Sequence, residues 1–311
     1  MRAVVALGGN ALSPPRASGS ADEMRAALAM TCAHLADLVT NGVSLVLTHG
    51  NGPQVGRILL QQEAAAPDIP AMPMDVCGAE SQGQIGYLLA QALDNALRAR
   101  GSDVRALCLV TQVVVDGRDP AFRRPTKPVG PYYDRPAAQR IAHETGHVFT
   151  IQPDRRWRRV VASPSPVRFV EEGPLLQIVE QGHCVVAAGG GGVPVVDVDG
   201  ELRGVDAVID KDRSAALLGG IVGADLLLIL TEVDVVQRGF GTPDATPLPR
   251  LTTAEARALL ARGEFPEGSM GPKVDAAATF VENGGPRAVV TSLANAAAAV
   301  EGAAGTEVVP A

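Results

Sequence analysis

The sequence predicts an α/β protein with a buried parallel sheet and helices on its faces. Short apolar runs recur along the chain, and several of them end at glycine-rich loops. The segments between these runs carry apolar residues at the three- and four-residue spacing of an amphipathic helix. The runs themselves are apolar almost throughout, as is typical of strands that are covered on both faces. Strands and helices therefore alternate, which is the pattern of an α/β sheet.

The first half of the chain predicts this alternation element by element. Its first two apolar runs both stop at a loop that contains two glycines. Ser20 and Glu23 have the spacing of a capping box, which predicts where the first helix begins, and Asn41-Gly42 ends it. The predicted segments are a strand at Arg2–Leu7, a helix between Ser20 and Asn41, a strand at 44–48, a helix from Ser81 to Gly101 and an apolar run at 106–115.

The stretch from Asp116 to Pro166 breaks the rhythm, because it is rich in proline and arginine, and it predicts a small protruding subdomain. The alternation then resumes. Asp199-Gly200 marks a hairpin, and Thr252 with Glu255 marks a second capping box. The predicted segments are a helix from Pro174 to Gly182, a strand at 183–188, a four-glycine turn at 189–192, helices at 213–222 and 272–281, a strand at 225–231 and a last strand at 287–291.

Composition and charge exclude several classes of protein. The 311 residues are 46% hydrophobic and 20% charged, which is a globular balance and excludes disordered chains and simple fibres. The net charge of −7 is opposite in sign to that of a nucleic-acid-binding surface, so we expect no nucleic-acid partner. The longest apolar runs, such as 226–230, fall far short of the ~20 residues that cross a bilayer. With no signal sequence at the start of the chain, a cytoplasmic location without membrane attachment is expected.

Three familiar motifs fail in their details. None of the lysines follows a glycine, which a P-loop requires. Gly50 to Gly56 misses the dinucleotide-binding spacing by one residue and carries a proline where the helix should begin. His143 and His147 match the H-E-x-x-H zinc motif, but Gly146 interrupts the helix that this motif needs. The four cysteines form no C-x-x-C pair. We therefore expect no resident metal.

The lysines are few, and two of them lie close to acidic residues or glycines. Of the 27 basic residues only Lys127, Lys211 and Lys273 are lysines. A chain that uses arginine for its solvated charges can retain lysine where a compact ammonium must meet a phosphate oxygen; base-composition bias is the alternative. Lys211 lies between Asp210 and Asp212 at a predicted helix start, where carboxylates can cap N–H groups or orient an ammonium. Lys273 follows a glycine-rich segment in the first turn of another helix.

Two glycine loops complete the pattern. Gly8-Gly9-Asn10 and Gly50-Asn51-Gly52 each follow a predicted strand and precede a helical region. Backbone N–H groups in such loops can bind an anion at a helix N-terminus, although glycines also serve simply to make tight turns. Phosphoryl transfer asks a protein mainly to position two substrates and to neutralise charge, which amides and lysines can do. The loops and the lysines together favour that chemistry.

Seven segments spread over nearly the whole chain form one set: 6–12 (ALGGNAL), 48–56 (THGNGPQVG), 125–131 (PTKPVGP), 157–161 (WRRVV), 189–194 (GGGGVP), 206–212 (DAVIDKD) and 268–274 (GSMGPKV). This set resembles the motifs of the carbamate kinases, which belong to the amino-acid kinase superfamily. Other members, such as acetylglutamate kinase, carry a lysine in the first loop, where this chain has Gly8-Gly9-Asn10. The resemblance implies a three-layer αβα sandwich around a mostly parallel sheet, and a homodimer.

The resemblance also implies a role for each site residue. Lys127 would reach over the transferring phosphoryl group, Lys211 and Lys273 would contact the nucleotide phosphates, and Asp212 would orient lysines. The substrate-binding residues that it implies are Gly8, Gly9, Asn10, Gly50, Asn51 and Gly52. The nucleotide-binding residues that it implies are Asp210, Thr231, Val233, Asp234, Ser269, Met270 and Gly271. Mg²⁺ would arrive with ATP or ADP, held mainly by their phosphates.

The implied reaction is reversible phosphoryl transfer between ATP and carbamate. Residues 1–212, including the subdomain at about 116–166, would bind carbamate or carbamoyl phosphate, and residues 213–311 would bind the nucleotide. Two alternatives stay open: a non-catalytic sensor of carbamoyl phosphate or nucleotide, and a kinase for another small carboxylate. The segment 143–156 fits the family pattern loosely, and activity would be reduced if this segment helps to aim Lys127.

Overall fold

The computed structural model describes residues 1–12, 19–66, 68–152, 154–266 and 268–311. Its main sheet has eight strands in the order β15-β17-β16-β12-β1-β2-β9-β3. Every neighbouring pair is parallel except β16 and β17, so the predicted α/β class with a mostly parallel sheet is confirmed. The strands are β1 (Arg2–Leu7), β2 (Ser44–His49), β3 (Ala106–Cys108), β9 (Cys184–Val186), β12 (Leu226–Thr231), β15 (Arg250–Thr252), β16 (Ala288–Ser292) and β17 (Thr306–Val309).

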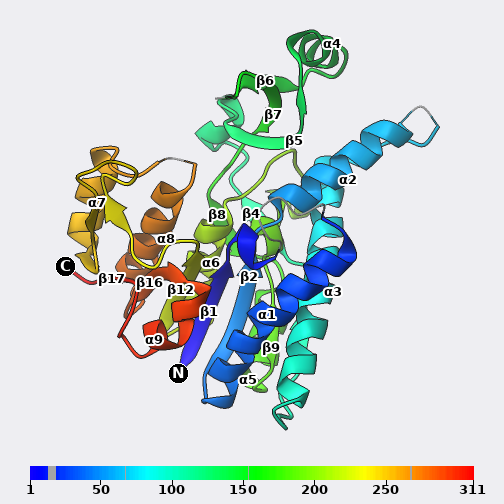
Figure 1. The fold of residues 1–311 in the computed structure, drawn as a ribbon. Helices are drawn as coiled ribbons and strands as arrows, with labels where there is room; N and C mark the ends of the chain where they lie inside the picture. The colour runs from blue at the N-terminus through cyan, green and yellow to red at the C-terminus, as the bar shows by residue number, and fades with distance from the viewer. Residues whose placement is uncertain (13–18, 67, 153, 267) are drawn as a thin grey trace.

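Helices cover both faces of this sheet and make a three-layer sandwich (Figure 1). Successive residues of β1 join opposite cores, because strand side chains alternate between faces and both faces are covered. One face carries α1 (Ala21–Thr40), α3 (Met74–Arg98) and α9 (Ala296–Val300); the other carries α5 (Glu172–Glu180), α6 (Lys211–Ile221), α7 (Thr253–Ala261) and α8 (Met270–Glu282). Within the described ranges, none of the helices has the length and hydrophobicity needed to span a membrane.

A smaller unit stands apart from the sandwich, at the top of Figure 1. It consists of a three-stranded sheet in the order β5-β7-β6 and the helix α4. The long helix α2 packs its residues Val55, Ile58 and Leu59 against this unit. The elements here are α2 (Gly52–Ala65), β5 (Lys127–Tyr133), α4 (Arg135–Thr145), β6 (Val148–Ile151) and β7 (Trp157–Val161). A separate four-stranded sheet consists of β4 (Gln112–Val115), β8 (Pro166–Phe169), β10 (Val193–Val198) and β11 (Glu201–Gly204). A short hairpin is formed by β13 (Gln237–Arg238) and β14 (Thr246–Pro247). Single 3-10 turns lie at Gly9–Ala11, Pro120–Arg123, Gly189–Gly191 and Leu293–Asn295.

The local signals in the sequence are confirmed. Ser20 and Thr252 each accept a hydrogen bond from the backbone N–H three residues on, and both capping boxes are complete. Asp199 and Gly200 both have positive φ, of 55° and 86°, as a tight hairpin turn requires. Gly146 has a φ of 74° and ends α4, so His143 and His147 do not lie one turn apart on a single helix.

Three expected boundaries were wrong. Helix α3 begins at Met74 rather than near Ser81, because its first turns face α2 and β5 instead of the sheet and so interrupt the expected periodicity. The apolar run 106–115 divides into β3 and β4, which belong to different sheets. A further strand, β17, follows the strand predicted to be last. Only two of its four residues are buried, which is too short an alternation to recognise, and buried Thr306 anchors it through bonds to Val236 and Leu248.

Candidate active site

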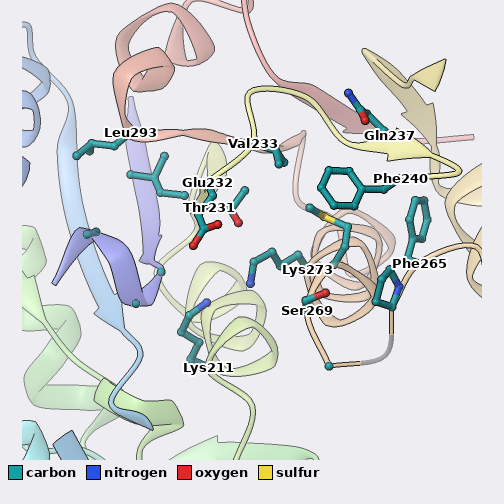
Figure 2. A pocket seen from close by; sticks show the side chains of 17 residues that line it. Lys211, Thr231, Glu232, Val233, Gln237, Phe240, Phe265, Ser269, Lys273 and Leu293 are labelled. Carbon is teal, nitrogen blue, oxygen red and sulfur yellow. The ribbon is translucent and has the colours of Figure 1, made fainter. Parts of the chain in front are cut away.

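Two cavities adjoin at the carboxyl ends of the parallel strands β1, β2 and β12. The larger has a volume of about 670 Å³, and the smaller about 230 Å³. Residues Lys211, Lys273, Gly268 and Ser269 line both. In Figure 2, Lys211 on α6 and Lys273 on α8 extend into the larger cavity. Ligands of open α/β sheets bind at this edge, so this pair of cavities is the candidate site.

Asp212 lies between the two shared lysines. Lys273 Nζ is 3.0 Å from Asp212 Oδ2, and Lys211 Nζ pairs with Oδ1. Only 3% of Asp212 is exposed. Burial alone would raise the pKa of Asp212, but the charges of Lys211 and Lys273 outweigh burial and hold this pKa below its usual value. Burial also lowers the pKa of Lys211, which the negative charge of Asp212 opposes. The carboxylate therefore fixes both ammonium groups in place.

The third lysine reaches the site from the smaller unit. Lys127 begins β5, and its Nζ is 2.8 Å from Asp210 Oδ2. Asp210 is the N-cap of α6, because its other oxygen accepts a hydrogen bond of 2.9 Å from the backbone N–H of Asp212. Burial would raise the pKa of Asp210, yet the charges of Lys127 and Lys211 lower it to about 2. One carboxylate thus caps a helix and orients an ammonium at the same time.

The strand β5 that carries Lys127 is held by its neighbours. Lys127 pairs with Val161 of β7, and Tyr133 at the far end of β5 meets Phe149 edge-on at 5.4 Å between ring centroids. The loosely matching segment 143–156 therefore packs against the strand of Lys127. Pro153, within that segment, lies outside the described residues, and so does the side chain of Asn10.

The loop after β2 presents the start of α2 to the smaller cavity. Gly50, Asn51 and Gly52 line this cavity, and Asn51 occupies the N-cap position without a side-chain bond to the helix. The first N–H groups of a helix have no partner within it, and together with the helix dipole they attract anions. Gly8 and Gly9, after β1, line the larger cavity instead.

The four-glycine segment was predicted only as a turn, but in the structure it packs closely against His49 and Asn51 beside the smaller cavity. A Cβ on Gly189 would lie 2.4 Å from His49 Nε2, and a Cβ on Gly190 would lie 2.1 Å from Asn51 Nδ2. Gly190 also lines the smaller cavity and has a φ of +65°. Burial lowers the pKa of His49 to about 4, so this histidine is neutral at physiological pH. Four consecutive glycines were the signal in the sequence for such close approach.

The larger cavity contains most of the predicted nucleotide-binding residues. Thr231, Val233, Ser269 and Met270 line it. Gly271 lies outside both linings, Asp210 lines the smaller cavity, and Asp234 is exposed and lines neither. Glu232, within the motif segment 231–234, also lines the larger cavity. The sequence reasoning missed several other lining residues, most of which lie outside the long helices and the central strands: Leu230, Gln237, Phe240, Phe265, Pro266 and Leu293. Figure 2 shows Phe240 and Phe265 on the side of the cavity away from Lys211.

Comparison with known proteins places the chain in a family. The sequence profile of the amino acid kinase family matches residues 1–292. The chain belongs to that family. A carbamate kinase of Pyrococcus horikoshii is 48% identical over 311 residues and covers 99% of both chains. One of Halobacterium salinarum is 50% identical over 308 residues, covering 99% of this chain and 98% of the relative. The structure of carbamate kinase from Giardia lamblia bound to AMP-PNP superposes with a TM-score of 0.94 at 40% identity, covering 100% of this chain and 98% of the other.

Proposed function

We propose that this amino acid kinase family member is a carbamate kinase, which transfers a phosphoryl group reversibly between ATP and carbamate. The observation that carries the proposal is the convergence of the three lysines of the sequence on the smaller cavity, two of which also line the larger. Three ammonium groups against the carboxylates of Asp210 and Asp212 leave a net positive charge. Phosphoryl transfer needs such a charge to stabilise the oxygens of the transferred group.

The two cavities divide the substrates. The larger takes the nucleotide, with its base on the side of Phe240 and Phe265 and its phosphates toward Lys211 and Lys273. The smaller takes carbamate or carbamoyl phosphate, beside the start of α2. In this proposal residues 1–212, with the subdomain at about 116–166, bind the carbamoyl substrate, and residues 213–311 supply most of the nucleotide site.

Each charged group then has one task. Lys127 stabilises the phosphoryl group during its transfer, and Lys211 and Lys273 bind the nucleotide phosphates. Asp212 orients these two lysines, and the backbone amides of the loops at 8–10 and 50–52 position the oxygens of the substrates. Carbamate itself is the nucleophile toward ATP, so no protein nucleophile is needed.

Mg²⁺ is the metal that the nucleotide would bring. The carboxylates nearest to the lysines, Asp210 and Asp212, are already paired with ammonium groups. This donor set fits a Mg²⁺ ion held mainly by phosphate oxygens and water, which is how Mg²⁺ commonly binds in kinases. When bound, the ion would neutralise charge on the phosphates.

The proposed assembly is a homodimer. β3 is an edge strand of the main sheet, and Leu107 on it and Tyr87 on α3 are exposed apolar residues that suit a second copy. Light scattering after gel filtration tests the stoichiometry. The proposal also places the enzyme in the cytoplasm, with its nucleotide substrate.

The deciding experiment is ATP formation from ADP, Mg²⁺ and carbamoyl phosphate by purified protein, with acetyl phosphate as the control donor. Turnover that prefers carbamoyl phosphate supports the proposal. Equal use of acetyl phosphate would favour a kinase for another small carboxylate. Binding of both ligands without turnover would favour a sensor.

A further inference from the structure

Asn51 lines the smaller cavity, and its side-chain amide does not make the hydrogen bond that its N-cap position favours. Asparagine is a preferred N-cap residue because its oxygen accepts a hydrogen bond from the first turn of the helix. Asn51 caps α2 without any such bond. Its Nδ2 instead donates to Ser81 Oγ on α3 at 2.7 Å, and only 9% of the residue is exposed. The amide is thus held by α3 and not by its own helix.

Ser81 determines which end of the amide faces it. The hydroxyl of Ser81, which is fully buried, donates to the carbonyl oxygen of Gly78 at 2.6 Å. A carbonyl can only accept, so this bond uses the single proton of Ser81. Ser81 must then accept from Asn51, and an accepting oxygen requires the nitrogen end of the amide. The hydrogen-bond network therefore turns Asn51 Oδ1 away from Ser81.

That oxygen is an acceptor without a donor. Within the described part of the chain no residue donates a hydrogen bond to Asn51 Oδ1. The two carboxylates that line the same cavity are both engaged: Asp210 by Lys127 and a backbone N–H, and Asp212 by two lysines. The other charged groups of this cavity are ammonium groups, which only donate. The cavity thus offers many donors to a ligand and, in Asn51, one free amide oxygen.

We propose that Asn51 Oδ1 accepts a hydrogen bond from the amino group of carbamoyl phosphate, and that Ser81 is the positioning residue that fixes this acceptor. The inference rests on the proposed function of the smaller cavity. The phosphate and carbonyl oxygens of carbamoyl phosphate are acceptors that suit the lysines and the start of α2, and its amino group is the only donor. Acetyl phosphate has a methyl group of similar size at that place, which would leave Oδ1 unpaired. The site would therefore select carbamoyl over acetyl donors.

The test measures kcat/KM for ATP formation from carbamoyl phosphate and from acetyl phosphate, and compares their ratio between variants. Ser81→Ala frees the amide to rotate and should lower the ratio about tenfold, chiefly through carbamoyl phosphate. Thr48→Val is the matched control. Thr48, on β2, is an equally buried hydroxyl that donates to a backbone carbonyl, that of Ala188 at 2.8 Å. Its loss should reduce thermal stability and leave the ratio unchanged.

Two variants of Asn51 keep the test decisive if Ser81→Ala does not fold. Asn51→Leu removes the acceptor and should lower the ratio, whereas Asn51→Asp retains an oxygen and should preserve the ratio while slowing both donors. An unchanged ratio in folded Ser81→Ala, or in Asn51→Leu, would overturn the inference and leave the proposed function standing. Wild-type protein that forms no ATP from carbamoyl phosphate would overturn both.

Discussion

Replacing Asp212 with asparagine tests the charge arrangement of the site most directly. In the native site three ammonium groups face two carboxylates, and the variant leaves three facing one. Asp212 is 3% exposed, and each of its oxygens holds a lysine. Removing one partner of a buried ion pair costs about 3–5 kcal/mol of stability. Because the lysines also lose the group that aims them, kcat/KM should fall by about 10²–10³-fold, as when a preorganised charge-stabilising donor is removed.

The effect of Asp212→Asn on stability also has a predictable pH dependence. The folded-state pKa of Asp212 is lowered, so its contribution is fully present above the unfolded value of about 3.9 and is lost as the pH falls through the folded pKa. The difference in unfolding free energy between wild type and variant should therefore be large near neutral pH and shrink in acid. Asp197→Asn is the control, because its pair with Arg168 is exposed and contributes little. An Asp212→Asn protein as stable and as active as Asp197→Asn would refute the reasoning.

Three further predictions concern the same site. Lys127→Arg should fold normally but lose most activity in the ATP-formation assay, because a planar guanidinium cannot replace a point charge; near-normal turnover would remove Lys127 from the mechanism. Gly190→Ala should raise KM for carbamoyl phosphate and lower the melting temperature more than the control Gly223→Ala does. Both positions have positive φ, but only the Cβ at 190 would meet another residue, at 2.1 Å from Asn51 Nδ2. Equal effects in the two variants would contradict this prediction. A chelator should abolish ATP formation and added Mg²⁺ should restore it, and turnover that persists in chelator would argue against a nucleotide-borne metal.

Features set by neighbouring residues could be predicted from the sequence. The capping boxes at Ser20 and Thr252 and the hairpin at Asp199-Gly200 depend on contacts within a few residues, and each formed as expected. The alternation of strands and helices also follows from a local feature, the spacing of apolar residues along the chain. β17 was missed because four residues are too few to show a period and its register comes from pairing with β15 and β16.

The candidate site was only partly accessible to the same reasoning. The scarcity of lysine and the family motifs pointed to all three lysines, but the contact of Lys127 with Asp210 joins residues 83 positions apart and exists only in the folded chain. Phe240 and Phe265 follow no periodic pattern, so nothing in the sequence distinguished them from other loop residues. Asp234 was implied by the resemblance as a nucleotide-binding residue, yet it lines neither cavity, and its backbone carbonyl accepts a hydrogen bond from the hydroxyl of Thr291.

The two cavities share Lys211 and Lys273, and this makes the occupants of the two cavities thermodynamically dependent on each other. A negatively charged ligand in one cavity pairs with ammonium groups that also face the other cavity, so it weakens the binding of a second anion there. By linkage, each ligand lowers the affinity of the other by the same factor. ADP with carbamoyl phosphate and ATP with carbamate carry the same three phosphoryl groups, whereas ATP with carbamoyl phosphate carries four. In the proposed division of the substrates, the shared lysines therefore disfavour the unproductive complex of ATP with carbamoyl phosphate and suit the two reactive pairs.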